Sequence, residues 1–173
     1  MTKNKVRPHR LTIPLEYSKK IVELAGNGRS YRDCILLTSG EFTDSISRTP
    51  IVYTNEALSK LSQNMMDGVY KLDSEKIPLN LDHTHNALNW IGYANHISYK
   101  GGKILGDLYL HRLTQPSKDT VALIDNGYLN ALSVEITTND TWNAEENKYY
   151  ASDINLIGLA VVSVGACPSA RIK

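Results

Sequence analysis

The sequence predicts one strand-rich α+β domain, and three observations support this fold class. The chain has 173 residues, of which 42% are hydrophobic and 21% charged, as expected for a globular domain with a single core. Ten tyrosines accompany one phenylalanine, and Val, Ile and Thr gather in short runs, which favours strands with half-buried faces. Only two segments show the periodicity and end chemistry of helices.

The first ten residues, MTKNKVRPHR, are basic, polar and aperiodic, so we expect a flexible N-terminal arm ahead of a single domain at 11–173. The next segment, LTIPLEY at 11–17, can pair at a sheet edge or lie extended. A strand is predicted for CILLTSG at 34–40, an aliphatic run that ends at a glycine and precedes a segment of turn-forming residues.

A helix is predicted from Asn55, whose side chain can cap its first turn. Leu58, Leu61 and Met65 recur at the spacing of one helix face. Gly68 follows as a C-terminal cap, because glycine adopts the left-handed conformation that ends many helices.

The middle of the chain alternates apolar and polar residues in the manner of a meander. We expect strands at 77–83, 90–99 and 103–112, with a turn at Gly101 and Gly102 between the last two. A second helix is predicted at 115–127, where Pro and Ser precede an apolar run and a glycine follows it.

The sequence of the C-terminal third predicts two further strands. YLNALSVEITT at 128–138 forms the first, and the Asn- and Glu-rich stretch at 139–150 is expected to be a hairpin tip. INLIGLAVVSVGA at 154–166 is apolar throughout, which is typical of a strand buried on both faces.

Composition disfavours several classes of function. The formal net charge is +1, so no overall field recruits nucleic acid or anionic lipid. No apolar run reaches the roughly 20 residues that cross a bilayer, and a cytoplasmic protein is expected. Cys34 and Cys167 are too few for a disulfide scaffold or a four-thiolate zinc site, and no cofactor motif is present.

Two of the five histidines, His83 and His85, lie in LNLDHTHN at a predicted strand end. A strand end fixes a side chain yet leaves it open to solvent, as a general base requires. Alternatively, the pair could simply solvate a turn. Residues at i and i+2 of an extended chain also point to one side, and Asp82 adds a carboxylate, so a metal-dependent hydrolase is a further alternative.

Ser133, in NALSVEI, is a candidate nucleophile because it follows the second helix and stands among small or flexible residues. A serine hydroxyl attacks a carbonyl when an imidazole takes its proton, and His83 could supply that base. An ordinary strand serine is the alternative. Cys167 is a rival nucleophile, although a cysteine between small residues beside a proline is more typical of packing.

The order of four motifs resembles a viral maturation protease. IPLNLDH is followed by IGYA with its Gly92, then by ALSVEI after a helix, and finally by LAVVSVGACPSA. This order is similar to that of tailed-phage prohead proteases and, more distantly, of herpesvirus assemblins, and the resemblance spans about residues 31–172. It implies a small, mostly antiparallel β-barrel flanked by helices.

Carried over residue by residue, the resemblance implies Ser133 as nucleophile and His83 as general base. The spacing counted back from Gly92 would favour His85 instead, so both histidines stay open as the base. The third residue of the family, a His or Glu that orients the imidazole, should fall near Gly158, and glycine has no side chain for this role.

Other groups could orient the imidazole in place of a residue at 158. Glu135, Asp153, Asn155 and the unused histidine are candidates, and a serine–histidine dyad is a further possibility. Assemblins also place arginines after the SVG-like segment to hold the oxyanion. Here Ala166, Cys167 and Pro168 follow instead, which leaves the oxyanion donors unassigned.

The resemblance implies a serine endopeptidase inside the viral procapsid, in the host cytoplasm, that needs no cofactor. Its expected substrates are the scaffold, the N-terminal segment of the capsid protein, and itself. The chain ends at PSARIK, which we interpret as a self-processing boundary after a lysine. The main non-enzymatic alternative is a β-barrel accessory module of the capsid, to which the same composition applies.

Overall fold

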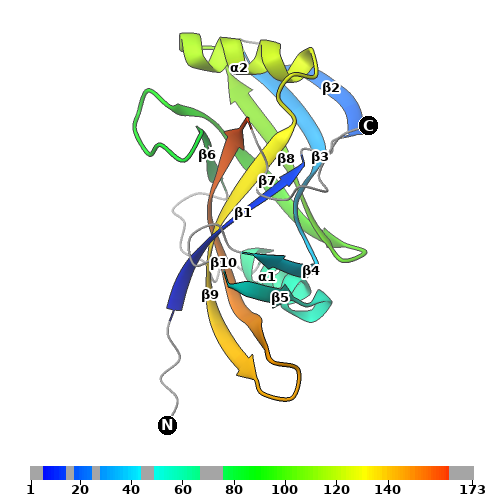
Figure 1. The fold of residues 1–173 in the computed structure, drawn as a ribbon. Helices are drawn as coiled ribbons and strands as arrows, with labels where there is room; N and C mark the ends of the chain where they lie inside the picture. The colour runs from blue at the N-terminus through cyan, green and yellow to red at the C-terminus, as the bar shows by residue number, and fades with distance from the viewer. Residues whose placement is uncertain (1–5, 15–17, 25–27, 44–48, 67–75, 164–173) are drawn as a thin grey trace.

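A computed structural model describes residues 6–14, 18–24, 28–43, 49–66 and 76–163 of the chain. The predicted helix end at Gly68, the rival nucleophile Cys167 and the expected processing boundary lie outside these residues. Within them the chain forms ten strands and two helices (Figure 1): β1 (Val6–Pro14), β2 (Ser18–Leu24), β3 (Gly28–Thr38), β4 (Gly40–Thr43), β5 (Pro50–Tyr53), α1 (Asn55–Met66), β6 (Ile77–Leu81), β7 (Trp90–Lys100), β8 (Lys103–His111), α2 (Gln115–Asp125), β9 (Ala131–Asn143) and β10 (Lys148–Val162).

The strands form one mixed sheet, which confirms the α+β class but not the closed barrel. Its order is β1-β9-β10-β6-β7-β8-β3-β2, and β5 adds to β10 and carries β4. Antiparallel pairs predominate, as predicted, and among the described strands only the pairs of β10 with β5 and with β6 are parallel. The predicted barrel is wrong and the sheet is open, because in the described part of the chain the strand path ends at β1 on one side and β2 on the other, with no ladder joining them.

Residues 6–10, expected in a flexible arm, belong to β1. This strand pairs antiparallel with β9 from Val6 opposite Asn139 to Pro14 opposite Ala131. The edge of β9 supplies backbone partners along the whole of β1, and such pairing requires no apolar periodicity in the strand that is added.

Both predicted helices are present. The cap of α1 is Thr54, one residue before the predicted one, and its Oγ1 accepts a hydrogen bond from the N–H of Ala57 at 3.1 Å. The second helix, α2, has Thr114 as its cap, with Pro116 in its first turn, and Gly127 follows its end with a φ of +76°. Threonine competes well for the cap position because its hydroxyl satisfies an N–H group that the helix leaves free.

The hairpin of β9 and β10 is longer than predicted. Much of the expected tip is strand, since β9 ends at Asn143 and β10 begins at Lys148. The rings of Trp142 and Tyr149 are 4.8 Å apart across the hairpin. This contact between opposed aromatic residues stabilises strand pairing in a segment whose polar composition indicated a loop.

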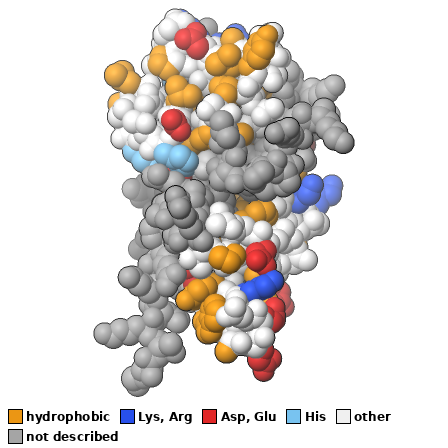
Figure 2. Space-filling model, in the orientation of Figure 1, with side chains coloured by type: hydrophobic (Ala, Val, Ile, Leu, Met, Phe, Trp, Pro, Cys, Tyr) orange, Lys and Arg blue, Asp and Glu red, His pale blue; other side chains and the backbone are white. Residues whose placement is uncertain are grey.

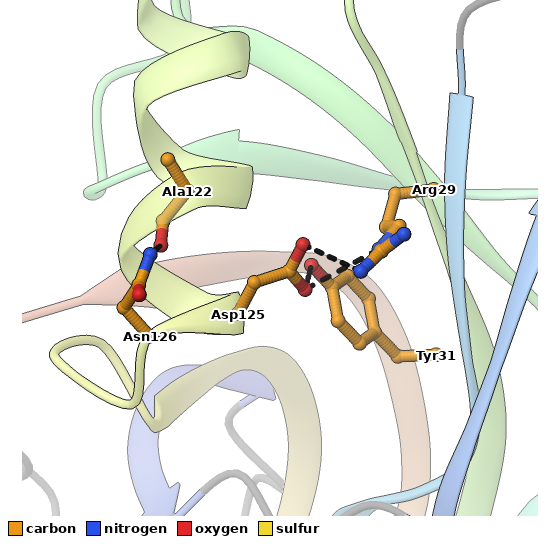
Figure 3. A network of polar contacts seen from close by, with 5 residues as sticks. All are labelled: Arg29, Tyr31, Ala122, Asp125 and Asn126. Carbon is orange, nitrogen blue, oxygen red and sulfur yellow. Dashed lines mark hydrogen bonds and ion pairs between the residues drawn. The ribbon is translucent and has the colours of Figure 1, made fainter.

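A partly exposed polar network joins the end of α2 to β3 (Figure 3). The Asp125 carboxylate binds the Arg29 guanidinium, with Nη2 at 2.7 Å, and accepts a hydrogen bond from the Tyr31 hydroxyl at 2.9 Å. The pKa of Tyr31 is raised by burial and by its hydrogen bond to Asp125. The network therefore favours the neutral phenol and fixes α2 against the sheet.

We expect Tyr31→Phe to lower the free energy of unfolding by about 1–2 kcal/mol at pH 8, because a partly buried hydrogen bond to a charged group is lost. The folded-state pKa of Tyr31 lies above the unfolded value, so the wild-type advantage holds below about pH 10 and declines as the pH rises further. Urea denaturation of both proteins at about pH 8 and about pH 10.5 measures this. An equal gap at both pH values would contradict the assignment.

Candidate active site

The candidate site begins at a sharp turn where β6 ends. Asp82 has a φ of +55°, in the left-handed region that non-glycine residues rarely adopt. Its N–H donates to the carbonyl of Val161 at 2.9 Å, and the N–H of Leu81 donates to the carbonyl of Asn89 at 2.7 Å. These two bonds close the loop onto the sheet, so the histidines that follow leave β6 from a fixed point.

The loop that carries the histidines is held by its own polar residue. Asn86 accepts hydrogen bonds at its Oδ1 from the N–H groups of Leu88 and Asn89, at 3.0 and 2.9 Å. Local bonds of this kind stabilise a turn without a core. The expectation of histidines on a fixed loop beyond a strand end is confirmed for His83 and His85.

Both histidines contact one carboxylate. Nδ1 of His83 lies 2.7 Å from Oε1 of Glu135, and Nε2 of His85 lies 3.0 Å from Oε2. The Glu135 side chain is only 6% exposed, compared with 24% for His83 and 56% for His85. A carboxylate removed from water requires hydrogen-bonding partners, and each of its oxygens has an imidazole. Figure 2 shows histidine side chains at the molecular surface on one face.

Ser133 lies on the same sheet face as Glu135. The ladder of β9 is regular between the two residues, and side chains two positions apart on a strand point to one side. Their neighbours Leu132 and Val134 point to the opposite side and join the main core. The face that carries the histidine-bound carboxylate therefore also carries the predicted nucleophile.

The hydroxyl of Ser133 is fully buried and, within the described residues, has no hydrogen-bond partner. An unpaired buried hydroxyl is uncommon in folded proteins, because it loses its bonds to water without replacing them. The bond from Ser133 to an imidazole that an active dyad requires is therefore not formed in this structure. Such bonds are often long before substrate binds.

Gly158 leaves space for the carboxylate of Glu135 because it has no side chain. It lies opposite Glu135 in the ladder of β9 and β10, and a Cβ atom at this glycine would lie 2.8 Å from Oε2 of Glu135. The carboxylate thus occupies the space that a side chain at 158 would take. From the sequence, Gly158 is only a position without a side chain, and its contact with Glu135 follows from the strand pairing.

Other candidates lie apart from this cluster. Asp153 binds Nζ of Lys60 at 2.7 Å and Nδ2 of Asn139 at 3.0 Å, and these bonds lower its pKa, the bond to Lys60 most of all. Its carboxylate is engaged there and is not brought to the histidines. Burial raises the pKa of the Cys34 thiol to about 12, so this thiol stays protonated at neutral pH.

The histidines do not form the metal site considered from their spacing. Among the residues that the structure describes, no group of three or more His, Cys, Asp or Glu is arranged to hold a metal ion. The nitrogens of His83 and His85 that face the protein bind Glu135 instead.

No helix in the described ranges is long and apolar enough to cross a membrane.

Comparisons with known proteins found a structural likeness. No protein-family model matches the sequence, and neither does any curated protein. The fold is similar to that of the capsid assembly protease gp21 of bacteriophage T4, with a TM-score of 0.61 and 14% sequence identity. The match covers 90% of this chain and 98% of that protein. The chain therefore has the fold of a phage capsid assembly protease, and the expected likeness to herpesvirus assemblins stays a prediction.

The positive φ of Asp82 leads to a prediction about how substitutions there change the free energy of unfolding. Glycine adopts this conformation freely, whereas a β-branched residue is strained in it. We expect Asp82→Gly to leave the free energy of unfolding nearly unchanged and Asp82→Val to lower it by about 1–2 kcal/mol. Urea denaturation of the two variants checks this. Equal stabilities would show that the turn does not depend on the positive φ.

Proposed function

We propose that this protein is a serine endopeptidase of phage procapsid maturation. The observation that carries the proposal is a buried carboxylate, Glu135, which holds His83 on the sheet face that also bears the unpartnered hydroxyl of Ser133. The fold shared with a phage capsid assembly protease supports the same conclusion. This arrangement has the order of groups found in serine hydrolases: nucleophile, imidazole and orienting acid.

In the proposed reaction, Oγ of Ser133 attacks the carbonyl carbon of the peptide bond. Nε2 of His83 takes the hydroxyl proton and then delivers it to the leaving amine, which produces an acyl-enzyme. Water, activated by the same imidazole, hydrolyses the ester and restores the serine. Glu135 holds the ring by its Nδ1–H and stabilises the imidazolium that forms at each step.

The contacts with Glu135 support His83, rather than His85, as the base. His83 uses Nδ1 for the carboxylate, which leaves its Nε2 as the acceptor for a serine proton. The other histidine uses Nε2 for the carboxylate and is the more exposed of the two. We assign to His85 a positioning role: it holds the second oxygen of Glu135 and so limits rotation of the carboxylate.

The proposed substrates are proteins of the procapsid. A capsid assembly protease of the same fold supports capsid proteins as substrates and the procapsid interior as the place of action. Scaffold proteins are proposed as substrates from the sequence resemblance. Self-processing and cleavage after lysine are proposed from the sequence resemblance. No cofactor is needed in this mechanism, because the imidazole and the carboxylate supply the proton transfer.

We expect Ser133→Ala and His83→Ala each to lower peptide cleavage at least about a thousandfold, because nucleophile and base act as a unit. Cleavage of a peptide library is followed by mass spectrometry, and a fluorophosphonate probe tests whether Ser133 is reactive. His96→Ala is the matched control, since Nδ1 of His96 also binds a carboxylate, that of Asp107 at 3.1 Å, and this histidine has no proposed role.

Three results would contradict these assignments. Cleavage that persists in Ser133→Ala would refute the nucleophile. Greater loss in His85→Ala than in His83→Ala would identify His85 as the base, whereas we expect only about a tenfold loss for His85→Ala. A wild-type protein that neither cleaves peptides nor reacts with the probe would favour the non-enzymatic capsid module.

The contact of Gly158 with Glu135 predicts that the orienting carboxylate can be moved between strands. Glu135→Ala should lower kcat by two or more orders of magnitude, on the order of the loss when a triad acid is removed. Adding Gly158→Glu should recover part of that loss, because the new side chain starts where the old carboxylate ends. The control is Gly158→Gln in the same background, which fills the space without a charge. Equal kcat in the two double variants would contradict the orienting role.

A further inference from the structure

The proposed reaction needs a hydrogen-bond donor that the residues assigned so far do not supply. When Oγ of Ser133 attacks a peptide carbonyl, the carbonyl oxygen becomes negatively charged and requires donors. Glu135 only accepts hydrogen bonds, and the proton that His83 takes up is delivered to the leaving amine. The donor to this oxyanion must therefore come from another group beside Ser133.

The strand ladders place one buried amide side chain in line with Ser133. On β9, Ser133 lies opposite Ala160 of β10, and Ala160 in turn lies opposite Asn80 of β6. Side chains of directly paired residues point to the same face of a sheet, because successive residues of each strand alternate between the two faces. The three residues therefore form one row across the sheet, with Ala160 between Ser133 and Asn80.

The burial of the neighbouring residues agrees with this orientation. The chain neighbours of the three row residues belong to the main core or pack against it: Leu79, Leu81, Leu132, Val134, Leu159 and Val161. In contrast, Ala160 belongs to a separate small cluster with Ala131 and Val162. The row therefore points away from the main core, to the face on which Glu135 binds the two histidines.

The small side chain of Ala160 leaves space between the ends of the row. Two strand spacings separate the Cα atoms of Ser133 and Asn80 by about 9–10 Å. A carbonyl carbon bonded to Oγ of Ser133 and lying over Ala160 would direct its oxygen toward the amide of Asn80. A hydrogen bond of about 2.7–3.1 Å from this amide closes the remaining distance.

The row is shielded from water in this structure. Ser133 and Ala160 are 0% exposed, and Asn80 is 5% exposed. A substrate must open the row before it reacts, and its carbonyl then lies in surroundings of low dielectric constant, where a hydrogen bond to a developing charge is stronger than in water. The amide of Asn80 is neutral, so its burial costs less than that of a lysine or arginine donor.

We propose that Asn80 is a catalytic residue that donates a hydrogen bond from Nδ2 to the oxyanion formed at Ser133. As the bond from Oγ to the carbonyl carbon forms, one electron pair of the C=O bond moves to the oxygen, and the serine proton passes to Nε2 of His83. The pair returns when the C–N bond breaks toward nitrogen, which takes the proton from His83. This inference rests on the proposed function, because it assumes that Ser133 is the nucleophile.

The test replaces the amide with side chains of similar size. Asn80→Leu removes both polar atoms, and Asn80→Asp keeps the shape but has an acceptor in place of the donor. The matched control is Thr138→Val, because Thr138 is also a buried polar residue and lies further along β9. The substrates are an ester and a thionoester with the acyl group of a peptide that the wild type cleaves. Rates are expressed per site labelled at completion by a fluorophosphonate, which excludes unfolded protein.

We expect both Asn80 variants to lower kcat for the ester by about a hundredfold to a thousandfold and to change KM by less than about threefold, because the donor acts on the charge of the transition state. Thr138→Val should leave both constants nearly unchanged. A kcat near the wild-type value in Asn80→Leu and Asn80→Asp would overturn the proposal.

The thionoester distinguishes a donor from a residue that only supports the fold. Sulfur accepts hydrogen bonds more weakly than oxygen, so an oxyanion donor favours the ester. The ratio of ester to thionoester hydrolysis should therefore fall at least about tenfold from the wild type to Asn80→Leu. A structural loss would lower both rates together, and an unchanged ratio would overturn the proposal.

A smaller pair of variants carries the same comparison if the larger side chains prevent folding. Asn80→Ser retains a hydroxyl donor, whereas Asn80→Ala has none, so the serine variant should hydrolyse the ester several-fold faster. Equal rates in this pair would overturn the proposal while the assignment of Ser133 stands. A wild-type protein that hydrolyses neither substrate and is not labelled at Ser133 would instead refute the proposed function, and this inference with it.

Discussion

The site depends on one constraint: the carboxylate of Glu135 is buried and must find its hydrogen bonds inside the protein. It is 6% exposed and binds one imidazole at each oxygen. Removing a charge from water is costly unless such bonds replace its hydration. Because His83 and His85 both lie on the loop after β6, this single carboxylate fixes the loop to β9. The positions of both imidazoles beside β9 thus follow from satisfying one buried acid.

Space for that acid comes from irregular pairing between β9 and β10. The register shifts twice, between Ser152 and Asn155 and between Leu156 and Gly158. With the register of the hairpin end continued unchanged, Glu135 would lie opposite Leu156. A leucine there would fill the space that the carboxylate occupies. The two bulges place a glycine opposite the acid instead, in keeping with the occurrence of bulges beside functional sites.

Much of this protein could be predicted from local sequence. Both helices, the meander and the histidines beyond β6 follow from periodicity, capping residues and turn chemistry, which act over a few residues. The open sheet and the pairing of residues 6–10 in β1 could not be predicted, because strand pairing depends on a distant partner rather than on the residues of the strand itself. The contact between Glu135 and Gly158 escaped prediction because it requires the register, and each bulge changes the register by one residue.

The geometry places an acid of β9 beside the position on β10 at which the orienting residue was expected. Opposed residues of an antiparallel pair have Cβ atoms about 4.5–5.5 Å apart, within the reach of a glutamate side chain. A carboxylate can therefore be brought to one point in space from either strand, provided that the opposite position is small. Glu135 and Gly158 meet this condition, since the space for a Cβ at the glycine is closed by Oε2 of the glutamate. The position of this carboxylate is therefore set by the pairing of two residues rather than by the identity of one.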